Sequence, residues 1–214
     1  MSDINIVHAL QMLLILLASV SIHEWAHAWA ADKLGDPTSK ALGRVTLNPI
    51  PHIDPLGTII LPLVFLLFGN GFFAWGKPVP VNPRNFKKPV RDDILVSMAG
   101  PASNLVIALI VAVVFGIAAR FVDPKAIFRL AYQIIEINAL LMVFNLIPVP
   151  PLDGSHVLRH LTKMSDAAFQ KFSQFGFLIL IGLLFLTPLG GMLWYAIQTV
   201  SNFALQIMLG IASF

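Results

Sequence analysis

A chain of 214 residues in which 57% are hydrophobic and only 12% are charged does not have the composition of a soluble globular domain, where roughly a quarter of the residues are charged. This composition predicts a single polytopic membrane domain over residues 1–214. The net charge of +3 comes from basic residues in short loops between apolar runs, which argues against nucleic-acid binding, and the lack of cysteine excludes disulfides and thiolate metal ligands.

The first apolar run covers residues 9–31. A helix of that length is about 34 Å long, enough to cross a hydrocarbon core of about 30 Å. No lysine or arginine precedes the run, and no cleavage site follows it, so we expect a retained transmembrane helix rather than a signal peptide. Gly35 and Pro37 provide the stop signals for this helix.

Prolines interrupt the region that follows, in which residues 44–47 are a candidate short strand. Residues 58–68 are apolar but too few to span a bilayer unaided, so they predict a re-entrant or interfacial segment. Residues 69–93 contain a Gly-Lys-Pro turn between extended flanks and predict a small membrane-associated β-hairpin.

Four further apolar runs complete the pattern, and the run at 172–187 is only marginally long enough to span. The other three cover residues 94–119, 126–147 and 191–212. The predicted fold is therefore an all-α polytopic membrane protein with about five transmembrane helices, a short hydrophobic segment and the hairpin. If the N-terminus lies outside, 11 of the 14 lysines and arginines fall on the cytoplasmic side, as the positive-inside rule requires.

His23, Glu24 and His27 form an H-E-x-x-H pattern within the first apolar run. Residues four apart lie on one face of a helix, so both imidazoles can reach one metal ion, with Glu24 nearby as a general base toward water. Hydrogen bonding to neighbouring helices is the alternative, but ionisable residues inside a membrane are costly and usually functional. The motif lies roughly 12 Å below the cytoplasmic end of its helix, which predicts an active site nearer the cytoplasm.

A catalytic zinc site needs a third protein ligand and an open position. The candidates near membrane depth are His52, Asp54, Glu136, Asp153, His156 and His160. Asp153 stands out because it ends an apolar run, in proline-rich backbone of the kind tolerated at membrane depth only where it is buried or lines a cavity. Its alternative role is a helix N-cap.

The H-E-x-x-H motif is followed far along the chain by N-x-x-P-x-x-P-x-D-G at residues 145–154 and by G-P-x-x-N at residues 100–104 between them. This combination resembles the site-2 protease family of intramembrane zinc metalloproteases, in its small prokaryotic form without PDZ or CBS domains. The resemblance implies one Zn²⁺ per chain and a transmembrane protein substrate in the lipid bilayer of the cell. It also implies that residues 72–81 accept an unwound substrate strand. The implied zinc ligands are His23, His27 and Asp153, and the implied catalytic residues are Glu24 as base and Asn145 for the substrate carbonyl or oxyanion.

The predicted function is an intramembrane zinc endopeptidase that acts in regulated intramembrane proteolysis. A membrane metal-binding or ion-carrier protein and a catalytically silent relative that binds membrane proteins remain the alternatives. Among the other polar residues, Asn104 either satisfies backbone near Pro101 or acts directly, His52 is expected to be structural, and Glu136 to make polar contacts within the bundle. A second metal site at His156 and His160 is disfavoured. The physiological substrate and the oligomeric state are left open by the sequence.

Overall fold

The structure, a computed structural model, describes residues 6–68 and 75–213 and contains only helices, turns and irregular segments within them. Five of its helices are long and apolar enough to cross a membrane, as predicted. These are α1 (Ile6–Leu34), α4 (Pro89–Ala118), α5 (Pro124–Asn145), α7 (Asp166–Leu186) and α8 (Leu189–Ala212). The shorter elements are α2 (Thr38–Ala41), α3 (Leu61–Phe68), α6 (Gly154–Leu161), the 3₁₀ turns η1 (Ile50–His52) and η3 (Pro83–Asn85), and the π-helical turn η2 (Pro55–Ile60).

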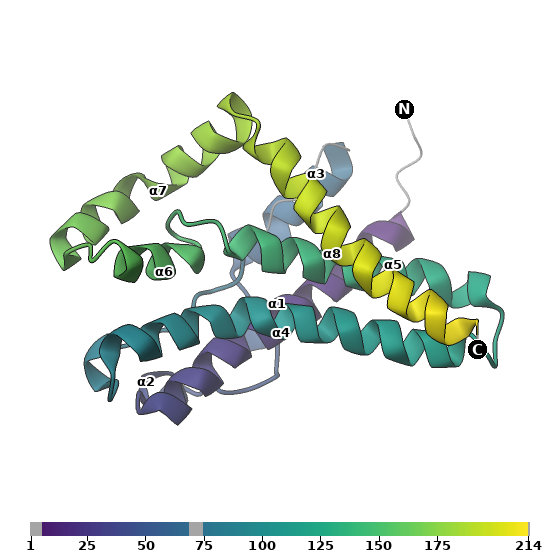
Figure 1. Cartoon of the computed structure of the whole chain (residues 1–214), viewed down its shortest axis with the longest axis horizontal. Helices are drawn as coiled ribbons and strands as arrows, with labels where there is room; N and C mark the ends of the chain where they lie inside the picture. Colours follow the sequence, from purple (N-terminus) through teal and green to yellow (C-terminus); the bar gives the residue numbers. More distant parts are fainter. Residues whose placement is uncertain (1–5, 69–74, 214) are drawn as a thin grey trace.

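Helix α4 is the centre of the bundle and packs against α1, α5 and α8 (Figure 1). Its contact with α5 and α8 is built largely from buried alanines, including Ala108, Ala112 and Ala204. At Gly116 a Cβ atom would lie only 2.8 Å from the Met208 carbonyl oxygen. Small residues let the backbones of membrane helices approach closely, which is the usual basis of packing where no hydrophobic effect separates helix from lipid.

Helix α7 lies at the edge of the bundle and diverges from it before the turn into α8 (Figure 1). Only 11% of the residues in its most apolar 18-residue stretch are buried. It begins at Asp166, earlier than the apolar run, because the Ser165 hydroxyl accepts a hydrogen bond from the backbone N–H of Ala168 and caps the helix. The marginal run at 172–187 is thereby extended into a 21-residue helix that is long enough to span.

The predicted β-hairpin is wrong for the part of it that the structure describes. Residues 69–74 lie outside the described residues, and residues 75–82 are irregular, without strand pairing. Pro78 and Pro80 have no N–H to donate to a ladder. Side chains bind the carbonyls instead: Arg44 donates to Lys77 and Pro78, and the Ser39 hydroxyl donates to Pro80. Residues 44–47, the other candidate strand, form bends.

The short hydrophobic segment consists of η2 and α3, which together are too short to count among the spanning helices. After this segment the chain returns to the start of η2. The backbone N–H of Trp75 donates to the Gly57 carbonyl, and the Thr58 hydroxyl donates to the Trp75 carbonyl. The indole of Trp75 covers Gly57 so closely that no Cβ could be accommodated there. The segment therefore leaves and rejoins the same side of the bundle.

Candidate metal centre

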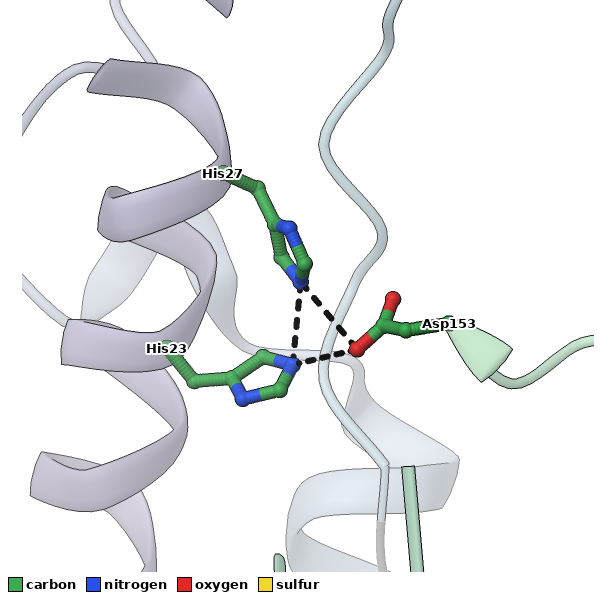
Figure 2. A group of neighbouring side chains, drawn as sticks. All are labelled: His23, His27 and Asp153. Carbon is green, nitrogen blue, oxygen red and sulfur yellow. Dashed lines mark hydrogen bonds and ion pairs between the residues drawn. The ribbon is translucent and has the colours of Figure 1, made fainter. Parts of the chain in front are cut away.

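Three side chains from two distant parts of the chain converge beside α4 (Figure 2). His23 and His27 project from one face of α1, and Asp153 immediately precedes α6. The Nε2 atoms of the two histidines are 3.1 Å apart, and Asp153 Oδ2 lies 3.2 Å from His23 Nε2 and 3.4 Å from His27 Nε2.

These separations fit a tetrahedral zinc site. Ligand atoms at about 2.0–2.2 Å from a tetrahedral zinc ion are separated from one another by about 3.3–3.5 Å. The triangle of two nitrogens and one oxygen is close to that size on all three sides. Three protein ligands with a fourth position open would be the arrangement of a catalytic rather than a structural zinc site.

A chain of hydrogen bonds determines which nitrogen of His23 carries the proton. Asn138 Nδ2 must donate to the Ile134 carbonyl, which can only accept, so Asn138 Oδ1 accepts from Asn104 Nδ2. Asn104 Oδ1 is then the acceptor 2.6 Å from His23 Nδ1, which must be protonated. In the neutral imidazole the lone pair of His23 is then on the second nitrogen, Nε2.

His27 is fixed in the same way by a carbonyl group. Its Nδ1 lies 2.7 Å from the Val96 carbonyl oxygen and must donate to it, so in the neutral imidazole the lone pair is on Nε2. Asp153 Oδ2 is buried and receives no hydrogen bond. With both imidazoles neutral, three lone pairs face one another, and a metal ion between them would satisfy all three whereas a single proton serves only two.

Gly100 of α4 faces this triangle at close range. A Cβ atom at Gly100 would lie 2.6 Å from His23 Nε2 and would collide with His27 Nε2 as well. Because glycine has no side chain, both Nε2 atoms can lie next to α4 at this position and point toward each other.

The triangle opens into a cavity of about 740 Å³. Glu24, which is 9% exposed, lies on the cavity wall, and its Oε2 accepts a hydrogen bond from the Val79 N–H at 3.0 Å. Asn145 lies on the same wall, and one of its amide N–H groups donates to the Leu141 carbonyl. The structure thus brings all five predicted site residues, His23, Glu24, His27, Asn145 and Asp153, to one cavity.

The other polar residues that the sequence indicated lie apart from the metal triangle, except Asn104. His52 binds the Thr46 carbonyl through Nε2 and supports the loop, as expected. Glu136 contacts Tyr132 and Gln198, so it makes polar contacts within the bundle, as expected.

Sequence reasoning missed Asn138, Gly100 and the Val96 carbonyl as supports of the two histidines. Asn138 offered a signal, because an asparagine inside an apolar span must find a polar partner. A backbone carbonyl carries no such signal.

Five spanning helices around two histidines, a carboxylate and a buried glutamate define an integral membrane protein with a hydrolytic metal centre. The sequence model of peptidase family M50 matches residues 11–123 and 119–189. The predicted zinc metalloprotease YwhC of Bacillus subtilis (strain 168) is 39% identical over 191 residues, which cover 86% of this chain and 84% of YwhC. The predicted zinc metalloprotease Rip2 of Mycolicibacterium smegmatis is 35% identical over 177 residues, 80% of this chain and 65% of Rip2.

A more distant match is zinc metalloprotease MJ0392 of Methanocaldococcus jannaschii, 25% identical over 149 residues, which cover 69% of this chain and 33% of that protein. No solved structure matches the chain significantly. The chain belongs to peptidase family M50, the site-2 protease family. It is an intramembrane zinc metalloendopeptidase, and the predicted family, activity and cofactor are confirmed.

Proposed function

We propose that His23, His27 and Asp153 bind the zinc ion and that Glu24 and Asn145 carry out the catalytic steps with it. The observation that carries this proposal is the convergence of three candidate ligand atoms, at nearly tetrahedral spacing, beside a buried glutamate. A zinc ion held there would supply a Lewis acid and lower the pKa of water to about 7.

Glu24 is placed to move the proton. Its Oε2 is held by the Val79 N–H, and its Oε1 lies near Gly76, where a Cβ atom would come within 3.4 Å of that oxygen. We expect Oε1 to take a proton from the attacking water and to pass it to the amine that leaves. Asn145 keeps a second N–H beyond the one bound to Leu141, and it would donate that hydrogen to the carbonyl oxygen of the scissile peptide.

The cavity favours an apolar peptide as the substrate. Apolar side chains of α5, α7 and α8 line much of this cavity. They are Leu140, Leu141, Phe144, Phe177, Leu180, Leu184, Leu193, Trp194 and Ile197. A segment of another transmembrane protein, unwound near the zinc ion, has the chemistry to occupy it. This is the substrate class predicted from the sequence, and it fits a cavity between membrane-spanning helices.

Strand addition to residues 75–81 receives little support from the contacts. Lys77 N–H donates to the His52 carbonyl and Val79 N–H donates to Glu24, while Pro78 and Pro80 have no N–H. An added strand would therefore meet no free donor between residues 77 and 80. We propose that this segment instead fixes the carboxylate of Glu24.

We further propose that the N-terminus lies outside and the site lies near the cytoplasm, with η2 and α3 forming a re-entrant segment. His27 lies seven residues before the end of α1, about 10 Å along the helix. The end of α1 and the start of α4 share one side of the bundle, since His27 contacts Val96 and His23 contacts Asn104. Cysteines introduced at Lys87 and Lys125 should be labelled from opposite sides of the membrane, and labelling of both from one side would refute the orientation.

The ligand and base assignments are tested by zinc content and by cleavage of a helical transmembrane model substrate. Glu24→Gln should retain zinc and lose cleavage by about 10²- to 10⁴-fold, because only the base is removed. A metal carrier would keep its function in this variant, and a silent relative would not cleave even as zinc-loaded wild type. Asp153→Ala should lose zinc; full zinc content and full activity in that variant would show that the ligand assignment is wrong.

A further inference from the structure

A second cluster of titratable side chains joins α4 to α6. Asp93, in the first turns of α4, is 3% exposed. Its Oδ2 lies 2.6 Å from His160 Nε2 and 3.2 Å from His156 Nδ1. The two histidines are four residues apart and therefore lie on one face of α6. No residue of this cluster has a role in the reaction described above.

The cluster differs from the metal triangle in how its ligand atoms meet. Among the described residues, only His23, His27 and Asp153 bring three candidate ligand atoms within 4.8 Å of one another. Asp93 Oδ2 and His160 Nε2, 2.6 Å apart, are hydrogen-bonded directly. The cluster is a contact between two helices, and its chemistry is that of a carboxylate that accepts hydrogen bonds from two imidazoles.

The contact bears on the metal centre because α6 begins directly after Asp153. An isolated helix of eight residues is not stable in water, so α6 depends on contacts of this kind for its position. Any force that holds α6 against α4 therefore also fixes the backbone from which the Asp153 carboxylate reaches the histidines.

The remaining supports of the metal triangle come from the same face of α4. Asp93, Val96, Gly100 and Asn104 follow one another at spacings of three and four residues, which places them in one stripe along the helix. The Val96 carbonyl holds His27, Asn104 holds His23, and Gly100 leaves room for both ring nitrogens. Asp153 is the one ligand of the three for which this stripe shows no direct bond.

We propose that Asp93, through His156 and His160, is a positioning residue for Asp153, so that a single face of α4 supports all three zinc ligands. This inference rests on the proposed metal site. It predicts that removing the Asp93 charge weakens zinc binding although Asp93 touches neither the zinc ligands nor the substrate carbonyl.

Asp92 provides a matched control. It is the neighbouring residue, it is also buried, and its carboxylate accepts hydrogen bonds at the start of its own helix, from the Lys88 N–H and from Arg91. Full-length Asp93→Asn and Asp92→Asn proteins would be compared by chelator competition for zinc and by the visible absorption of bound Co²⁺, which reports ligand geometry. We expect zinc affinity at least tenfold lower in Asp93→Asn than in Asp92→Asn, with an altered Co²⁺ spectrum.

The histidines offer an independent arm if Asp93→Asn fails to fold. His156→Gln with His160→Gln should lower zinc affinity to a similar extent, and adding Asp93→Asn should lower it little further, since all three act through one contact. Zinc affinity and Co²⁺ spectra equal to those of Asp92→Asn in both arms would overturn the inference. Failure of the metal site itself would appear separately, as unchanged zinc binding in Asp153→Ala.

Discussion

Replacing Gly100 with alanine places a methyl group against the two ring nitrogens that define the metal centre. The new Cβ would lie 2.6 Å from His23 Nε2, whereas real Cβ atoms essentially never approach a heavy atom within 3.0 Å. The contact with His27 Nε2 is closer still, so the imidazoles or helix α4 must shift by at least about 0.4 Å, which exceeds the tolerance of about 0.2 Å on zinc–ligand distances. Because both histidines are displaced, we expect zinc affinity to fall at least 100-fold, or about 2.8 kcal/mol.

Gly116→Ala is the control for crowding in the same helix. Its Cβ would lie 2.8 Å from the Met208 carbonyl oxygen, far from the metal centre, so it should lower thermal stability and leave zinc affinity unchanged. Alanine is itself favoured over glycine inside a helix by about 1 kcal/mol, so Gly100→Ala should remain folded. Zinc content after purification and chelator competition measure the effect. A Gly100→Ala protein that binds zinc as tightly as wild type would refute the placement of the metal between these nitrogens.

Two further predictions concern residues outside the metal triangle. Asn138→Leu should lower zinc affinity by about 10- to 100-fold, because it removes the acceptor that orients Asn104 toward His23. Asn202→Ala, at an exposed asparagine, serves as the control. Equal zinc affinities of the two variants would contradict the tautomer assigned to His23. Burial alone would raise the pKa of Asp36, but four hydrogen bonds from Thr38, Asn82 and Asn85 outweigh burial and hold that pKa below 3.8. Because the pKa of Asp36 is lower in the folded than in the unfolded protein, this stabilisation is present above about pH 4 and is lost as the pH falls further. Asp36→Asn should therefore flatten the acid dependence of the melting temperature in detergent. A variant with the acid dependence of the wild type would show that Asp36 does not contribute to it.

The five spans and the catalytic motif were predictable because both depend on local patterns. A run of apolar residues long enough to cross a bilayer has few alternatives to a transmembrane helix. The four-residue spacing of His23 and His27 places them on one face of any helix, whatever surrounds it. Asp153 could be singled out because proline-rich backbone beside an apolar run needs a buried or hydrated setting.

The prediction of a hairpin failed because turn residues and extended flanks do not reveal what the backbone groups bind. In residues 75–82, side chains such as Arg44 and Ser39 bind the carbonyls that a second strand would have bound. Those partners lie more than 30 residues earlier in the chain. Likewise, His156 and His160 have the four-residue spacing of a metal site, and only the structure shows that both contact the Asp93 carboxylate.

From the sequence alone, one could infer a polytopic membrane domain, the two histidines, the base and the candidate third ligand, because helix periodicity and hydrophobic length act over a few turns. Only the tertiary structure revealed that α4 lies against α1 with Val96, Gly100 and Asn104 facing the histidines, and that Asn138 orients Asn104. Those relations depend on how helices distant in sequence pack, and packing sets both the protonated nitrogen of each histidine and the space left for the metal.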